Sequence, residues 1–287
     1  MNFTIDQTHR YIAGVSSVAL FGFCAPLHLC FLLTIYTTQS LWKFVAYRII
    51  FHVCILNLLH VLTTLELGIL ILTLTKLPVF LMAMGGMLNW YVFAFLGIFS
   101  FVQALNRFAV IWEVRLLMAD RIYSALLLLC WTVAILSVAV SFLFGTAKFE
   151  LITISFAWYA RTPNDVNWFV NNFYMYTVPA FLIISGCLYV LCVLKLATDR
   201  GSIDKRDIAL LPQTIVPFVF LVLGRLMNFF PHNMIVVVLF FMRSVPVLYV
   251  ITYLVFNRTL RHAVMKTFRW RVKTNVVKVS VTQLASL

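Results

Sequence analysis

Long apolar segments separated by short polar connections dominate the pattern of residues along this chain. A helix of about 20 apolar residues crosses the ~30 Å hydrocarbon core of a bilayer. Windows of that length locate seven segments, near 12–37, 49–73, 79–109, 122–144, 168–194, 209–230 and 234–256. The pattern therefore predicts an all-α membrane protein, a seven-transmembrane helix bundle, with residues 1–256 as its transmembrane domain.

The remaining residues, 257–287, follow a different pattern and are expected to form a basic cytoplasmic tail. The segment NRTLRHAVMKTFRWR (257–271) places four apolar residues on one helical face, with basic residues around it. Those four are Leu260, Ala263, Val264 and Phe268. This spacing predicts a short amphipathic eighth helix lying along the inner leaflet. A disordered basic tail is the alternative.

Composition supports a membrane protein and narrows the chemistry. Of the 287 residues, 63% are hydrophobic and 11% are charged, whereas soluble domains average roughly half and about a quarter. All six cysteines fall inside apolar runs, so the sequence predicts neither an extracellular disulfide nor a cysteine metal site. No motif for a cofactor or for enzymatic catalysis is present, and we expect neither.

The distribution of the 22 basic residues predicts the orientation in the membrane. Most of them lie in the connections near 38–48, 110–121 and 195–208 and in the tail. Only four lie on the other side, namely Arg10, Lys76, Lys148 and Arg161. Because positive charge marks the cytoplasmic side, the N-terminus is expected outside and the C-terminus inside. The net charge of +13 is thus an orientation signal that favours the anionic inner leaflet, and it implies no nucleic acid.

Two triplets match the acceptor pattern for N-glycosylation. The first, NFT (2–4), places Asn2 on the predicted outer side, where it would be usable. The second, NRT (257–259), lies on the predicted cytoplasmic side and is expected to be silent. The first apolar run is too long for a typical cleaved signal peptide, so we expect it to act as a signal anchor.

Seven helices with an outer N-terminus and an eighth helix on the membrane are the plan of G-protein-coupled receptors. At the inner end of the third span, Asn106, Arg107 and Phe108 form NRF. This triplet resembles the D/E-R-Y motif of rhodopsin-like receptors and, more closely, the LNRF of nematode serpentine chemoreceptors such as the class x group. In the seventh span PVLY, from Pro246 to Tyr249, resembles the P-x-x-Y part of the N-P-x-x-Y motif.

Two further positions carry the resemblance, and others depart from it. Trp131 in the fourth span and Pro179 in the fifth are similar to residues typical of rhodopsin-like receptors. Asn106, however, replaces the acidic residue that usually pairs with the arginine. The second span has Asn57 and His60 in place of the family's aspartate, which puts a bound sodium ion in doubt. These departures fit the divergent nematode families better than mainstream rhodopsin-like receptors.

The resemblance implies a chemosensory receptor that binds a small-molecule ligand, an odorant or a pheromone, and couples to a heterotrimeric G protein. It implies that Arg107 packs among the third, fifth and sixth helices as a switch, with Asn106 and Phe108 beside it. Pro246 would then act as a hinge and Tyr249 as a latch. The alternative for Arg107 is a topology anchor whose side chain extends to the membrane interface.

Three ionisable residues lie in the outer halves of spans, at depths of roughly 8–14 Å. They are Glu66 in the second span, Arg225 in the sixth and Arg243 in the seventh. Charged groups at such depth are costly unless they are paired or face a cavity, and they are functional candidates by default. All three are candidate ligand-binding residues. If the second, sixth and seventh helices adjoin, Glu66 pairs with Arg243 and leaves Arg225 to meet an anionic ligand; otherwise Glu66 itself faces the ligand. A purely structural salt bridge is the alternative.

Other seven-helix functions fit less well. A retinal pump needs a lysine in the last span, and residues 234–256 contain none. A secondary transporter usually shows repeat symmetry and more intramembrane carboxylates. A polytopic transporter or ligand-gated channel is nevertheless kept as the alternative function. For the receptor, the expected location is the plasma membrane and, through the family resemblance, the sensory cilium.

Overall fold

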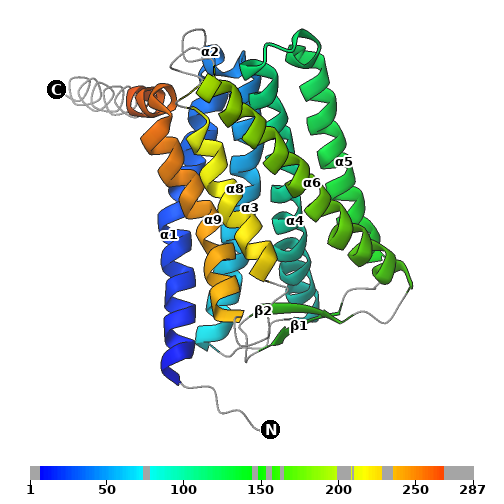
Figure 1. Cartoon of the computed structure of the whole chain (residues 1–287). Helices are drawn as coiled ribbons and strands as arrows, with labels where there is room; N and C mark the ends of the chain where they lie inside the picture. Colours follow the sequence, from blue (N-terminus) through cyan, green and yellow to red (C-terminus); the bar gives the residue numbers. More distant parts are fainter. Residues whose placement is uncertain are drawn as a thin grey trace, which may run out of the picture.

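The computed structural model of the chain describes residues 7–73, 78–143, 148–152, 157–161, 165–198, 208, 210–227 and 235–267. Seven long helices lie side by side in one bundle (Figure 1). In chain order they are α1 (Gln7–Thr37), α3 (Val45–Thr73), α4 (Val79–Ile111), α5 (Asp120–Leu143), α6 (Asp165–Thr198), α8 (Pro212–Met227) and α9 (Ile235–Phe256). Each one overlaps a predicted span, so the seven-helix fold predicted from apolar periodicity is confirmed.

Helix length and composition agree with a membrane location. Within the described ranges, five helices are long and apolar enough to cross a bilayer, and they belong to α1, α3, α4, α5 and α6. Two shorter apolar helices, Pro212–Leu226 and Arg243–Phe256, complete the bundle. The chain is therefore a multi-pass membrane protein.

The connections differ between the two ends of the bundle (Figure 1). One end carries the short helices α2 (Gln39–Trp42) and η1 (Arg115–Met118). The other end carries a two-stranded antiparallel hairpin of β1 (Lys148–Ile152) and β2 (Ala157–Arg161), in which Lys148 is opposite Arg161. The hairpin was not predicted, because its five-residue strands are too short to stand out within the polar connection at 145–167.

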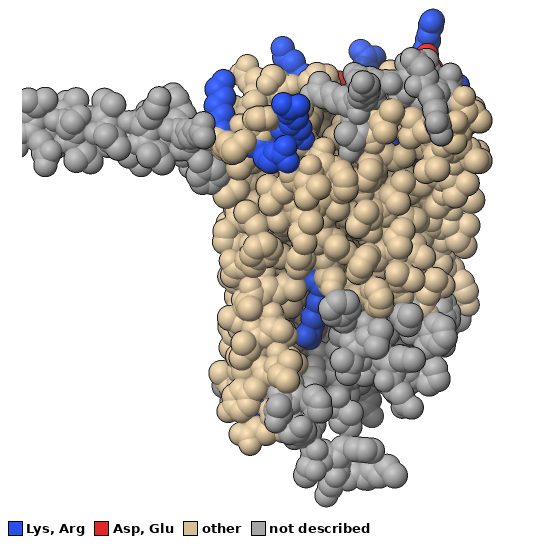
Figure 2. Space-filling model, turned by 60° about the vertical axis from the view of Figure 1, so that its left-hand side comes forward, with Lys and Arg blue, Asp and Glu red and all other residues tan. Residues whose placement is uncertain are grey.

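Basic residues identify the end with α2 and η1 as the cytoplasmic end. Figure 2 shows most of the visible blue Lys and Arg side chains gathered there, above a largely uncharged wall that holds a further blue patch in its lower part. The positive-inside rule predicts that this end faces the cytoplasm. We call the half of the bundle next to it the cytoplasmic half and the half next to the β-hairpin the outer half.

In the outer half, α1 and α3 approach each other through small residues. A Cβ added at Gly68 would lie 2.7 Å from the Cβ of Ser17 and 3.1 Å from the carbonyl oxygen of Gly14. The first distance is too short for a side chain, and the second is tighter than an ordinary contact. The contact therefore needs glycine, as is typical of closely packed membrane helices.

An eighth helix follows α9 and covers residues 258–267, which confirms the amphipathic helix over that range. Leu260 is fully buried, and Ala263 and Val264 pack against the core of the bundle. Phe268, the fourth predicted member of this apolar face, lies outside the described residues. The predicted apolar face thus docks on the bundle as well as facing the membrane.

Two side chains hold the junction between α9 and the eighth helix. Asn257 accepts a hydrogen bond from the backbone N–H of Leu260 at 3.0 Å, which makes it the N-cap, and another from the hydroxyl of Tyr47 at 3.1 Å. Arg261 donates to the carbonyl oxygen of Leu254 at 2.8 Å, at the C-terminal end of α9. Asn257 is 1% exposed, which gives its glycosylation triplet a second, structural reason to be silent.

The cytoplasmic end of α4 has a defined stop. The N–H of Val114 donates to the carbonyl of Ala109, and the N–H of Glu113 donates to that of Val110. This is the Schellman arrangement, which requires a left-handed residue at the position occupied by Glu113. Glu113 has a φ of 52°, unusual for a residue other than glycine or asparagine. The end of α4 is therefore set by tertiary context at a local conformational cost.

Candidate functional site

Asn106 and Arg107 lie in the last turns of α4, inside the cytoplasmic half of the bundle. Their exposed fractions are 5% and 4%. The Arg107 side chain is therefore enclosed by the bundle and does not extend to its surface. Phe108, the third residue of the motif, is only partly buried and stacks on Trp112 with ring centroids 5.8 Å apart.

Several helices converge on Arg107. Its charge lies within electrostatic range of Tyr123 at the start of α5 and of Tyr189 and Cys192 on α6. A small cavity beside it is lined by residues of α3 and by Thr214 of α8. Arg107 of α4 thus lies among α3, α5, α6 and α8.

Tyr249 of α9 is 1% exposed and faces the same region. Its hydroxyl donates to Oε1 of Gln103 at 3.4 Å, and Gln103 lies one helical turn before Arg107 on α4. Its ring packs against Tyr253 with centroids 5.6 Å apart. On the next turn of α9, the Thr252 hydroxyl lies 3.3 Å from the carbonyl oxygen of Gln213 at the start of α8. These contacts connect α9 with α4 and α8.

The region around Arg107 and Tyr249 holds several buried polar side chains. Within the described part of the chain, both side-chain polar atoms of Gln213 have no hydrogen-bond partner. The hydroxyls of Tyr123, Tyr189 and Tyr253 lie next to the side chains of Asn106, Thr214 and Gln103. A buried polar group without a partner costs ~1–3 kcal/mol. The buried Gln213 side chain at the start of α8 therefore needs an explanation.

Pro246 lies inside α9 and is held from α1. Nε2 of the buried His28 lies 3.3 Å from the Pro246 carbonyl oxygen, so the Nε2-protonated tautomer donates to it. Proline has no N–H to continue the helix ladder, and a bend at such a site is common. His28 therefore supports the helix at the predicted hinge.

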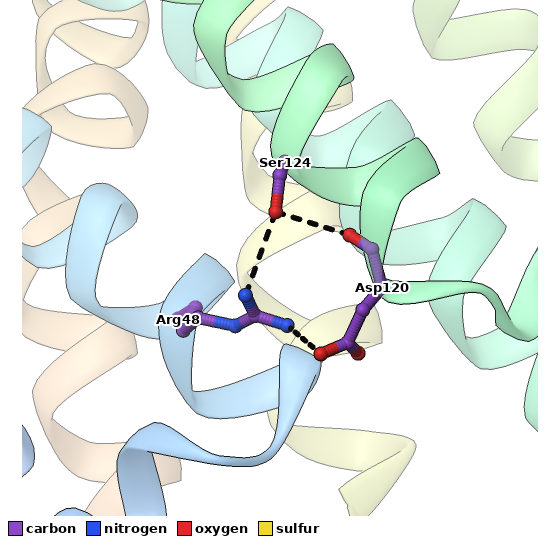
Figure 3. Close-up of polar contacts among 3 residues, drawn as sticks. All are labelled: Arg48, Asp120 and Ser124. Atoms are coloured by element: carbon purple, nitrogen blue, oxygen red, sulfur yellow. Dashed lines mark hydrogen bonds and ion pairs between the residues drawn. The ribbon is translucent and has the colours of Figure 1, made fainter.

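A second polar contact at the cytoplasmic end is an ion pair between α3 and α5 (Figure 3). Nη2 of Arg48 lies 2.9 Å from Oδ2 of Asp120, the first residue of α5. Arg48 also reaches the Ser124 hydroxyl at 3.5 Å, and that hydroxyl donates to the Asp120 carbonyl at 3.0 Å. Farther from the cytoplasmic end, in the same pair of helices, Trp131 donates its indole N–H to His52 at 3.0 Å. These bonds hold the fourth transmembrane helix against the second.

In the outer half, the three predicted ionisable residues do not form one cluster of ion pairs. Glu66 on α3 lies against Gly85 of α4, where any side chain would collide with its carboxylate. No ion pair joins Glu66 and Arg243 in the described part of the structure, so the predicted alternative in which they pair is not formed. Arg225 on α8 stacks over the ring of Phe93 on α4 at 5.6 Å.

Two apolar cavities lie between helices. One of about 480 Å³ is lined by residues of α3, α4 and α5, including Tyr91 and Trp131. The other, of about 580 Å³, lies between α6 and α8 and contains Arg225. Both fall in the range of ~300–1,000 Å³ that is typical of small-molecule sites.

In the described ranges, no group of three His, Cys, Asp or Glu residues is placed to hold a metal ion.

Several residues of the cytoplasmic site were missed by the sequence analysis. Gln103, Tyr189 and Gln213 lie within apolar runs and match no short motif, and the same is true of His28. A polar side chain inside a predicted span was the available signal.

Asn2 and most of the loop at 195–207 lie outside the described residues, so the structure places neither.

Comparison with known proteins identifies the fold but no close relative. No protein-family model matches the chain, and no curated protein matches it in sequence. The crystal structure of squid rhodopsin is similar, with a TM-score of 0.73 over 93% of this chain and 87% of that one. Sequence identity over the match is only 13%. The chain therefore has the seven-transmembrane fold of rhodopsin.

Proposed function

We propose that the chain is a G-protein-coupled chemosensory receptor. The observation that carries the proposal is the burial of Arg107 at the cytoplasmic end of α4, among α3, α5, α6 and α8. A buried arginine is costly in a membrane protein. A site that retains one among buried tyrosines and glutamines of neighbouring helices fits a switch better than a static anchor.

The proposed switch exchanges the partners of Arg107. In the resting arrangement the guanidinium is enclosed by α6 and α8. Outward movement of α8 would release Arg107 toward the cytoplasm, where it would meet a G protein, while Tyr189 and Tyr249 would gain partners in the opened space. Pro246 would supply the hinge in α9. A ligand would drive this change only through different affinities for the two states.

The proposed ligand is a small molecule, an odorant or pheromone, that enters from the outer side. Glu66, Arg225 and Arg243 are the proposed ligand-binding residues, because ionisable groups in the outer half are functional candidates. Asn2 is the proposed glycosylation site. The NRF motif supports placement near the nematode serpentine receptors, in the plasma membrane and in sensory cilia.

The test is signalling by Arg107→Ala in cells that co-express promiscuous Gα subunits. An odorant screen on the wild-type chain first supplies an agonist, and nucleotide exchange then reports coupling. We expect Arg107→Ala to abolish agonist-driven exchange at equal surface expression, and Arg107→Lys to retain part of it because the charge remains. The matched control is Arg115→Ala, which removes an exposed arginine from the neighbouring η1.

Normal signalling by surface-expressed Arg107→Ala would contradict the switch. An N-terminal tag that is accessible only from the cytoplasm would contradict the orientation. The transporter or channel alternative predicts something different, namely agonist-dependent ion or solute flux in proteoliposomes that lack any G protein.

A further inference from the structure

The cavity between α6 and α8 is a groove in the membrane-facing wall of the bundle. Residues along both of its edges project outward, and Met175, Ile183, Val219 and Leu226 are 38%, 68%, 42% and 50% exposed. Its lining is apolar apart from Arg225. Lipid acyl chains surround such a surface in a bilayer, so a ligand can enter the groove sideways from the membrane.

Arg225 lies at the outer end of this groove. It belongs to the last turn of α8, next to the outer end of α6, where Met175 and Pro179 line the same groove. The other end, toward the middle of the membrane, is formed by Gly186 and Phe218. From Met175 to Gly186 the groove follows α6 for roughly 16 Å. The groove therefore has a charged outer end and an apolar inner end.

The charge of Arg225 is not neutralised within the described part of the chain. Its guanidinium stacks on Phe93, its Nε has no hydrogen-bond partner, and no carboxylate lies within ion-pair distance of it. Cation–π stacking offsets only part of the cost of burying the charge. An anion at this end of the groove would supply the missing partner.

We propose that this groove binds a single-chain fatty carboxylate, with its carboxylate on Arg225 and its alkyl chain running inward toward Gly186. Arg225 lies about five residues, or roughly 8 Å, below the predicted end of the span. A carboxylate at the tip of one chain reaches that depth alone, whereas a phospholipid phosphate would have to bring its glycerol group and a second chain with it. This inference specifies the ligand class of the proposed receptor and rests on the ligand role proposed for Arg225.

Gly186 provides a way to close the groove without changing its charge. A Cβ at this position would meet Phe218 at 3.6 Å, which is ordinary contact. Leucine in place of Gly186 therefore fits locally and fills the inner end of the groove. Gly22→Leu is the matched control, because nothing lies within 4 Å of a Cβ at Gly22 on α1.

The experiment uses the purified full chain in nanodiscs with an octadecanoic acid that carries a diazirine on its chain and a terminal alkyne. Cross-linked peptides are identified by mass spectrometry. We expect labelling of α6 and α8 that excess octadecanoic acid displaces and its methyl ester does not. Arg225→Gln and Gly186→Leu should each lower labelling roughly tenfold, as expected for loss of a charge-assisted bond or of the chain's space.

Arg10→Gln, which removes another outer arginine, and Gly22→Leu should leave labelling unchanged. Equal displacement by the methyl ester, or unchanged labelling in both groove variants, would overturn the proposal. Stronger labelling by a photoreactive phospholipid would also overturn it. So would a disulfide between two copies of the Ile183→Cys variant that prevents labelling, because a second copy of the chain would then occupy the groove. Because no G protein is present, a binding failure is distinct from a signalling failure. Melting temperature and size-exclusion profile report whether each variant folds.

Discussion

The cytoplasmic half and the outer half of the bundle stabilise their helices in different ways. In the cytoplasmic half, polar side chains join neighbouring helices, as Arg48 does with Asp120 and Tyr47 with Asn257. In the outer half, hydrogen bonds also join helices, as Tyr174 does with Ser137, but α1 and α3 meet there at Gly14 and Gly68. A side chain added at Gly68 would collide with α1, so this contact tolerates no added atom. The ion pair and the cap at the cytoplasmic end involve side chains that can each lose one partner without separating the helices.

The largest effect is expected where the outer half has no room. In Gly68→Val the new Cβ would lie 2.7 Å from that of Ser17, so α1 and α3 must separate. Overpacking of this kind costs ~1–3 kcal/mol. The thermal midpoint of the detergent-solubilised protein should fall clearly, while Gly22→Val should leave it unchanged. An unchanged midpoint for Gly68→Val would show that the two helices do not need close contact.

The next effect is expected at the junction between α9 and the eighth helix. Asn257→Ala removes the N-cap and the partner of Tyr47, and loss of an N-cap costs ~0.5–2 kcal/mol. Hydrogen exchange of residues 258–267 should become faster, with little change in α1 or α3. Tyr47→Phe, which removes one of the two bonds, should have a smaller effect. Equal exchange rates in wild type and Asn257→Ala would refute the capping role.

A stabilising change is expected at the end of α4. Glu113 has a φ of 52°, a left-handed conformation that costs a residue with a Cβ about 1 kcal/mol relative to glycine. Glu113→Gly should therefore raise the thermal midpoint slightly. Glu113→Ala, which removes the charge and keeps the Cβ, separates the backbone effect from the charge effect. The explanation fails if the alanine variant is as stable as the glycine variant.

The smallest effect is expected from the ion pair in Figure 3. Asp120 is 64% exposed and Arg48 is 19% exposed, so solvent screens their attraction. A double-mutant cycle with Arg48→Ala and Asp120→Ala should give a coupling of ~0.2–1 kcal/mol that decreases with salt. A coupling well above this range would place the pair among the main constraints on the cytoplasmic half.

The sequence analysis succeeded where one physical property dominated. Each helix overlaps a predicted span because a bilayer requires about 20 apolar residues per crossing. The positions of Arg107 and Tyr249 were anticipated from short motifs, and the structure brings both into the cytoplasmic half. It failed where partners are distant in the chain, since nothing local indicates that Tyr47 reaches Asn257 or that His28 reaches Pro246. Nothing local specified whether Glu66 pairs with Arg243 either, because shared depth does not specify which helix faces which.

The sequence by itself determined the number of helices, their orientation through basic residues, and the amphipathic face of the helix over 258–267. Hydrophobicity and charge are properties of single segments, so a linear pattern records them. Only the tertiary structure decided that Arg107 is enclosed rather than extended to the interface, that Glu113 adopts a left-handed backbone, and that Arg225 lies in an apolar groove. These features depend on how helices rotate and pack against one another, and packing is a property of the whole bundle.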